Sequence, residues 1–143
     1  MLHIHDLKED GIIVEEATST EFLFVSERER YPPKWEYLLV PSKEYVNGRL
    51  KEVNVLAQVE RIVSRSDVLR QDLDIEALER IKAAGIDEIK TLGRARILGY
   101  MPEGSWQVYL PRRAVVPGQP IYIAPKGVLS EFFSYPKNEG LHI

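Results

Sequence analysis

The sequence predicts a mainly β protein, a small closed or partly open β-barrel of about six to seven strands with one inserted amphipathic helix and a short C-terminal helix. Three observations lead to this fold class. Short apolar stretches of strand length recur along the 143 residues, turn signals separate them, and a helical period replaces the strand pattern in one internal segment. The pattern fits a barrel or a sandwich, and closure into a barrel removes exposed strand edges.

The first strands surround a hydroxyl-rich turn. Apolar runs at 11–17 and 21–25 flank Thr18-Ser19-Thr20, and the hydroxyl side chains of these three residues favour turns. The two runs therefore predict a β-hairpin. A third strand, Tyr37 to Val40, is expected to stop at Pro41, because proline cannot donate a hydrogen bond to a neighbouring strand.

A tight turn at Asn47-Gly48 leads to the fourth strand, because both residues tolerate positive φ. This strand spans Val53 to Val63 and alternates in part. One face is expected to carry Val55, Ala57, Val59 and Arg61, and the other Leu56, Gln58, Glu60 and Ile62. We expect one face to be more polar than the other.

The inserted helix is predicted near residues 74–84. Ile75, Leu78 and Ile81 recur every three residues, which is typical of an amphipathic helix. Asp74 is the expected N-cap, and Gly85 is the expected residue after the last turn.

A long strand is expected from Ile89 to Tyr100. Its two faces are expected to carry Leu92, Arg94, Arg96 and Leu98 on one side, and Ala95, Ile97 and Gly99 on the other. Glycines at 93 and 99 predict bends or bulges. Further strands are expected at 106–110 and 119–124, followed by a helix at 127–133 and a linker at 134–139.

The length predicts one domain, because about 70% of the unfolded surface can be buried in a chain of 143 residues. We assign residues 1–10 to an N-terminal extension, 11–126 to the barrel with its helical insertion, and 127–143 to a short helix and linker. The chain has no cysteine, which excludes disulfides, thiolate metal sites and a cysteine nucleophile.

The charge distribution is uneven. Residues 1 to 92 carry 13 Lys and Arg against 19 Asp and Glu, a net charge of −6, whereas residues 93 to 143 carry 6 against 3, a net of +3. The overall charge of −3 argues against a nucleic-acid-binding surface over the whole chain. The sequence shows neither a signal peptide nor a membrane-spanning run, so we expect a cytoplasmic protein without a membrane partner.

Motifs of enzymes and metal sites are absent from the sequence. No glycine is followed directly by lysine, which excludes a P-loop. Ser105 lacks the Gly-x-Ser-x-Gly frame of a hydrolase nucleophile, and Glu15-Glu16 would point to opposite faces of a strand. His3 and His5 could share a strand face but have no third ligand nearby. We therefore expect no catalytic residue, no metal and no cofactor in this chain.

Five residues are the candidates for contact with a partner. They are Arg94, Arg96, Trp106, Arg112 and Arg113. Paired arginines bind phosphates or acidic side chains, and they also occur as solvated surface residues. The aromatic residues Trp35, Tyr37, Trp106 and Tyr109 could stack bases in an oligonucleotide-binding barrel, although packing in a core is the commoner role.

Four segments resemble the N-terminal barrel of HerA-type hexameric DNA translocases, called the HAS barrel. They are the hairpin at 11–25, the strand at 57–62, the strand at 93–100 and the segment Pro117 to Ile123. The helix-containing insertion fits the same pattern, and the resemblance covers roughly residues 9 to 143.

The resemblance implies a non-catalytic assembly and partner-docking barrel of an ATP-dependent DNA translocase in DNA end resection and recombinational repair. Its implied partners are neighbouring subunits of a homo-hexameric ring, a NurA-like nuclease, and duplex DNA through the full assembly. ATP and magnesium are implied only for an ATPase core, which we expect to continue beyond Gly140-Leu141-His142-Ile143. The alternative is a free-standing oligonucleotide-binding or adaptor barrel that uses the arginines and Trp106.

Overall fold

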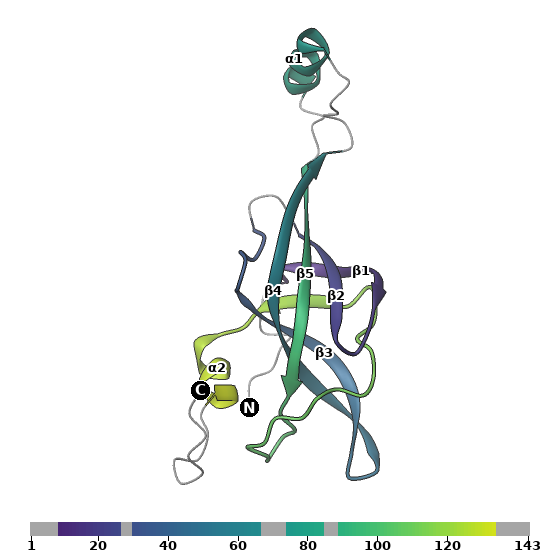
Figure 1. The fold of residues 1–143 in the computed structure, drawn as a ribbon, viewed down its shortest axis with the longest axis vertical. Coiled ribbons are helices and arrows are strands. Elements are labelled where there is room, and N and C mark those ends of the chain that lie inside the picture. The colour runs from purple at the N-terminus through teal and green to yellow at the C-terminus, as the bar shows by residue number, and fades with distance from the viewer. Residues whose placement is uncertain (1–8, 27–29, 67–73, 85–88, 134–143) are drawn as a thin grey trace.

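Six antiparallel strands close into a barrel (Figure 1). The structure is a computed structural model and describes residues 9–26, 30–66, 74–84 and 89–133. The strands are β1 (Gly11–Ala17), β2 (Glu21–Ser26), β3 (Tyr37–Val46), β4 (Arg49–Ser66), β5 (Ile89–Tyr100) and β6 (Pro120–Ile123). Around the barrel their order is β1-β2-β5-β4-β3-β6. This architecture, together with two short helices, confirms the predicted fold class.

The barrel interior is filled by apolar side chains from all six strands. Its largest fully buried members include Phe22, Phe24, Ile13, Leu38, Val55 and Ile121. Gly93 on β5 leaves room for one of these rings, because a Cβ at this position would lie 2.1 Å from Cζ of Phe24. This close approach explains why a glycine stands in the middle of a long strand.

The predicted alternation of β4 is correct as far as Val59 and wrong beyond it. The register between β4 and β5 shifts between Val59 and Arg61, which places one extra residue, Glu60, on β4. As a result Arg61 is exposed on the outer wall, and Ile62 packs against the interior. The sequence pattern predicts Arg61 on the face of Val59, and the bulge makes this prediction wrong.

The predicted end of the third strand at Pro41 is also wrong. β3 continues to Val46, where the Asn47-Gly48 turn confirms the prediction with φ values of 52° and 80°. The other neighbour of β3, strand β6, pairs only with Leu38 and Leu39. Beyond Leu39, no strand among the described residues pairs with β3 on that side, and a strand position without a ladder partner tolerates proline.

The strand expected at 106–110 forms only one isolated bridge. Tyr100 and Tyr109 exchange two backbone hydrogen bonds of 2.8 Å. Ser105 Oγ accepts a hydrogen bond from Gln107 N, which curls the backbone just before the bridge, and Pro111 follows soon after it. These local features leave too little extended chain for a ladder.

The two helices lie at opposite ends of the molecule (Figure 1). α1 (Ile75–Ala84) lies beyond the far ends of β4 and β5, and its N-cap is confirmed because Asp74 Oδ1 accepts a 2.7 Å hydrogen bond from Ala77 N. α2 (Lys126–Phe133) confirms the predicted C-terminal helix and packs Phe132 on the outside of the barrel. No helix among the described residues is long and apolar enough to cross a membrane.

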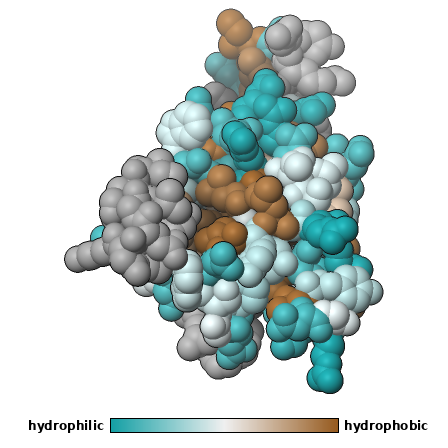
Figure 2. Space-filling model, turned by 60° about the horizontal axis from the view of Figure 1, so that its bottom comes forward, coloured by the Kyte–Doolittle hydropathy of each residue, from teal (hydrophilic) through white to brown (hydrophobic). Residues whose placement is uncertain are grey.

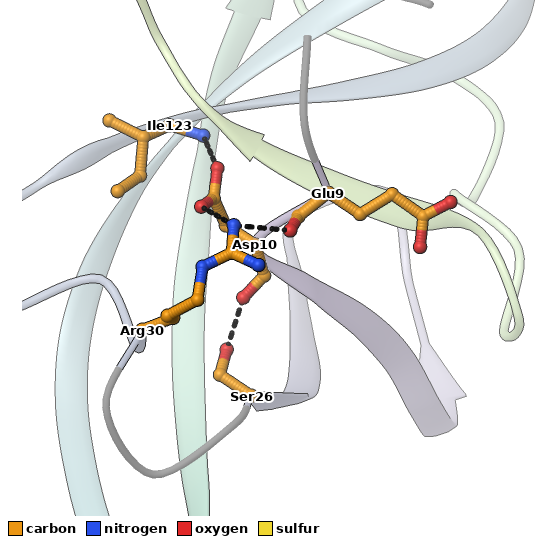
Figure 3. Close-up of polar contacts among 5 residues, drawn as sticks. All are labelled: Glu9, Asp10, Ser26, Arg30 and Ile123. Atoms are coloured by element: carbon orange, nitrogen blue, oxygen red, sulfur yellow. Dashed lines mark hydrogen bonds and ion pairs between the residues drawn. The ribbon is translucent and has the colours of Figure 1, made fainter.

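A polar cluster around Asp10 joins β1, β2 and β6 (Figure 3). Asp10 Oδ2 accepts a 2.8 Å hydrogen bond from Ile123 N, and its carbonyl oxygen accepts one of 2.7 Å from Ser26 Oγ. Arg30 Nη2 donates to the Glu9 carbonyl at 3.1 Å and lies 3.4 Å from Asp10 Oδ1. Through these contacts, Asp10 joins the end of β2 to β6 where the barrel closes, so we assign the cluster a structural role.

The remaining predicted features fall outside the described residues. They are His3, His5, Gly85, most of the N-terminal extension and the linker at 134–139.

Candidate interaction surfaces

An apolar row crosses the outer wall of four neighbouring strands. Ile12 pairs with Val25, Val25 with Leu92, and Leu92 with Val63, so the row runs over β1, β2, β5 and β4. Directly paired residues of antiparallel strands project from the same face. Ile12 and Val63 are 45% and 38% exposed, and the two residues between them are half-buried. Together these side chains form an apolar row that reaches solvent.

The next row on the same wall is half apolar and half basic. Val14 pairs with Leu23, Leu23 with Arg94, and Arg94 with Arg61. We call the six apolar residues of the two rows the outer patch. They are Ile12, Val14, Leu23, Val25, Val63 and Leu92.

Basic side chains border the outer patch on β4 and β5. Arg61, Arg94 and Arg96 are exposed on one side of the apolar row, and Arg65 and Lys90 form the next pair on its other side. Arg96 pairs with Glu21 on β2, which places one carboxylate beside it. The wall therefore combines aliphatic contact area with a positively charged border.

A groove of about 670 Å³ lies at the other end of the barrel, between α2 and the segment that follows β5. Its apolar lining includes Leu39, Met101, Val128 and Phe132. Three exposed carboxylates also line it, from Glu52, Glu103 and Glu131, and the described lining contains no lysine or arginine. We call this feature the acidic groove. Figure 2 shows this end of the molecule, where apolar side chains lie among hydrophilic ones.

Trp106 lines the acidic groove and is 51% exposed. Its indole ring is therefore open to solvent, unlike the aromatic rings of the barrel interior. Exposed tryptophan beside a groove is typical of contact sites, because aromatic rings contribute large contact areas at protein interfaces. This position favours a docking role over core packing.

Arg112 and Arg113 are held in place through their backbone. Glu44, which is buried at 2% exposure, accepts hydrogen bonds from Arg112 N at 2.9 Å and Arg113 N at 3.1 Å. Both arginine side chains are exposed, and the guanidinium carbon of Arg113 lies 5.9 Å from the centre of the Tyr45 ring. The buried carboxylate thus fixes the segment that carries both cations.

Two buried tyrosines have raised pKa values. Burial raises the pKa of the Tyr100 phenol above its ordinary value, and the negative charge of Glu44 adds to this rise. Burial likewise raises the pKa of Tyr122. Both phenols are therefore neutral near pH 7, and neither is primed to act as a base.

The five predicted contact residues occupy three separate places. Arg94 and Arg96 border the outer patch, Trp106 lines the acidic groove, and Arg112 and Arg113 flank the Glu44 carboxylate. The structure therefore does not unite them in one site.

Sequence reasoning missed three parts of these surfaces. The outward position of Arg61 depends on the bulge in β4, which the sequence pattern does not indicate. The role of Glu44 depends on hydrogen-bond partners that lie 68 and 69 residues away in the sequence. The outer patch needed the strand order, because its members come from four strands. The one indication of the outer patch in the sequence is the presence of aliphatic residues on the otherwise polar faces of the expected strands.

Comparisons with known proteins name no family. A scan against models of protein families finds no match, and no relative is found among curated proteins. Within the described ranges, no group of three or more histidine, cysteine or acidic residues is placed to hold a metal ion.

Proposed function

We propose that this barrel is a non-catalytic assembly and partner-docking domain, which joins copies of a larger protein to one another and to a partner. The observation that carries the proposal is the outer patch, a partly exposed aliphatic surface across four strands with a basic border. Contiguous apolar surface of this kind marks interaction sites on proteins that are otherwise folded around a closed core.

The composition of the outer patch favours a protein partner. Its six apolar members are all aliphatic, so it offers no aromatic face on which a base could stack. Four strands spaced by about 4.8 Å make the patch roughly 15 Å wide, and its two rows lie two residues, or about 7 Å, apart along the strands. The resulting area, on the order of 100–200 Å², is smaller than the ~800 Å² per partner of a standard interface, so the patch alone supports only weak association.

The larger context in the proposal comes from the resemblance in sequence. We propose that the barrel belongs to a HerA-like ATP-dependent DNA translocase in DNA end resection and recombinational repair. In this assignment its partners are the neighbouring subunits of a homo-hexameric ring and a NurA-like nuclease. ATP and magnesium act at a separate ATPase core, and duplex DNA is engaged by the whole assembly.

The test is self-association of the whole chain, measured by sedimentation velocity up to roughly millimolar concentration. Val63→Asp places a charge in the outer patch and is expected to reduce association. Leu110→Asp is the matched control, because Leu110 is 75% exposed and lies outside the patch. A chain that stays monomeric throughout, or a Val63→Asp variant that associates like the wild type, contradicts the proposal.

The alternative, an oligonucleotide-binding barrel, is favoured by one observation: Arg61, Arg94 and Arg96 gather on one wall. Its test is fluorescence anisotropy with labelled single-stranded and duplex oligonucleotides at two salt concentrations. Binding that weakens steeply with salt and is lost in Arg94→Glu would support DNA contact through this wall. The assembly proposal expects little binding at any salt concentration.

A further inference from the structure

The described lining of the acidic groove holds three carboxylates and no lysine or arginine, together with apolar side chains and the exposed Trp106. Glu52 has a cationic cross-strand neighbour in Lys43 on β3, so Glu103 and Glu131 are the carboxylates offered to a cationic partner. The chemistry that fits such a groove is a projecting apolar surface with cationic side chains beside it.

The outer patch has this complementary chemistry. It is aliphatic, it lies on the convex wall of the barrel, and Arg61 and Arg94 border it. Charge complementarity between two surfaces of one chain points to a second copy as the occupant of the groove.

The two surfaces are also far enough apart to engage two different neighbours. The groove contacts β4 at Glu52 to Asn54, whereas the patch reaches β4 at Val63 and its basic border reaches β4 at Arg61. Nine residues of strand separate Asn54 from Val63, which is about 30 Å. The centre of the patch lies on β2 and β5, and in the closed strand order β3 and β6 stand opposite them.

We propose that the acidic groove of one copy receives the outer patch of a second copy, in a head-to-tail contact that rests on the assembly function proposed above. Each copy then keeps one free groove and one free patch, so the contact repeats. A repeating head-to-tail contact closes into a ring or continues as a filament, whereas a patch-to-patch contact would stop at a dimer.

Both halves of the contact contribute to its strength and direction. The aliphatic patch of one copy and the exposed indole of Trp106 in the other bury apolar area against each other. The patch by itself buries too little apolar area for a stable interface. The arginines beside the patch and the carboxylates of the groove favour contact between a patch and a groove. Contact between two patches would instead bring their arginines together and so be repulsive.

The absence of cysteine from the chain makes cross-linking a direct test. Val63→Cys places one thiol in the patch, and Glu131→Cys places one on α2 beside the groove. After treatment with a short bismaleimide, we expect dimers when the two variants are mixed and none from either variant alone. Ile75→Cys is the control, because Ile75 is 75% exposed on α1, away from both surfaces.

Charge reversal supplies a second readout. Glu103→Arg with Glu131→Arg makes the groove basic, and Arg61→Glu with Arg94→Glu makes the patch border acidic. Each double variant alone is expected to associate roughly tenfold more weakly than the wild type, because like charges then meet. An equimolar mixture is expected to recover wild-type association, because every groove again meets a patch of opposite charge.

The outcomes separate this inference from the assembly proposal. Dimers formed by Val63→Cys alone would show patch-to-patch contact, which overturns the inference and leaves assembly through the patch intact. If association is weakened by Val63→Asp but unchanged by Glu103→Arg with Glu131→Arg, the inference is likewise overturned and assembly through the patch is left intact. A wild-type chain that never associates overturns both.

Discussion

Replacing Glu44 by glutamine tests whether the buried carboxylate holds the segment of Arg112 and Arg113. In the wild type, two carboxylate oxygens accept two backbone N–H groups at 2.9 and 3.1 Å. Glutamine keeps the size of the side chain but offers one acceptor oxygen, and its NH₂ group must face the other backbone N–H. One hydrogen bond is therefore lost, and the remaining bond loses its charge.

The expected magnitude follows from these two changes. A hydrogen bond to a charged group contributes about 1.5–3 kcal/mol, and a neutral one about 1 kcal/mol. The neutral amide also removes part of the penalty for burying a charge, which offsets some of the loss. We expect Glu44→Gln to lower the free energy of unfolding by about 2 kcal/mol and the Tm by roughly 6 °C.

The assay is urea unfolding followed by circular dichroism, combined with hydrogen exchange at the Arg112 and Arg113 amides. Glu103→Gln is the control, because this exposed side chain lies elsewhere and its change should stay within about 0.5 kcal/mol. The reasoning is refuted if Glu44→Gln unfolds at the wild-type urea concentration while both amides keep their protection from exchange.

Three further substitutions probe the barrel interior. Gly93→Ala should destabilise the protein by about 1–3 kcal/mol in urea unfolding, because its Cβ would lie 2.1 Å from the Phe24 ring. Thr91→Val should stabilise it by about 1 kcal/mol in the same assay, because the buried Thr91 Oγ1 finds no hydrogen-bond partner among the described residues. The pKa of the Tyr100 phenol is raised above 10.0 in the folded state, so the phenol ionises at lower pH in the unfolded chain than in the folded one. The folded state therefore loses stability as the pH rises past about 10. Tyr100→Phe should therefore lose less stability than the wild type between about pH 9 and 11, as followed by thermal unfolding, and an unchanged pH profile would contradict this.

Features encoded by neighbouring residues were predictable from the sequence. The Asn47-Gly48 turn depends on the φ values that these two residues tolerate, and both values are positive in the structure. The N-cap depends on one aspartate three residues before the amide that it binds. Strand β5 alternates as expected from Leu92 to Ile97, so Arg94 and Arg96 lie on one outward face as predicted. Beyond Ile97 the alternation fails, because a register shift leaves Leu98 as an extra residue and pairs Gly99 with Leu56, outside the interior.

Features decided by distant neighbours were not predictable in the same way. Pro41 was expected to end its strand, but it is tolerated because the pairing of β3 with β6 ends at Leu39. The bulge at Glu60 has no local signature, since an extra residue in one strand is defined only by its partner. The segment 106–110 has the composition of a strand, yet only Tyr109 finds a partner. The candidate surfaces depend on the same long-range pairings, which is why single residues were found and the surfaces were not.

The uneven charge of the chain acquires a different meaning once the barrel is closed. The acidic groove takes Glu52 from the first part of the sequence and Glu103 and Glu131 from the basic second part, so the linear charge split does not set its character. The fold brings these carboxylates together beside Glu52, near one end of β4, whereas Arg61 and Arg94, which border the outer patch, lie toward its other end.

Because the proposed contact combines charges with apolar burial, it should respond only moderately to salt. Raising the ionic strength from 0.1 to 1 M shortens the Debye length from about 10 to 3 Å, which weakens exposed charge pairs while aliphatic contacts persist. Self-association measured by sedimentation should therefore weaken several-fold and survive, whereas binding to DNA phosphates would fall by orders of magnitude over the same range. Association abolished in 1 M salt would mean that the arginines, and not the aliphatic rows, hold the copies together.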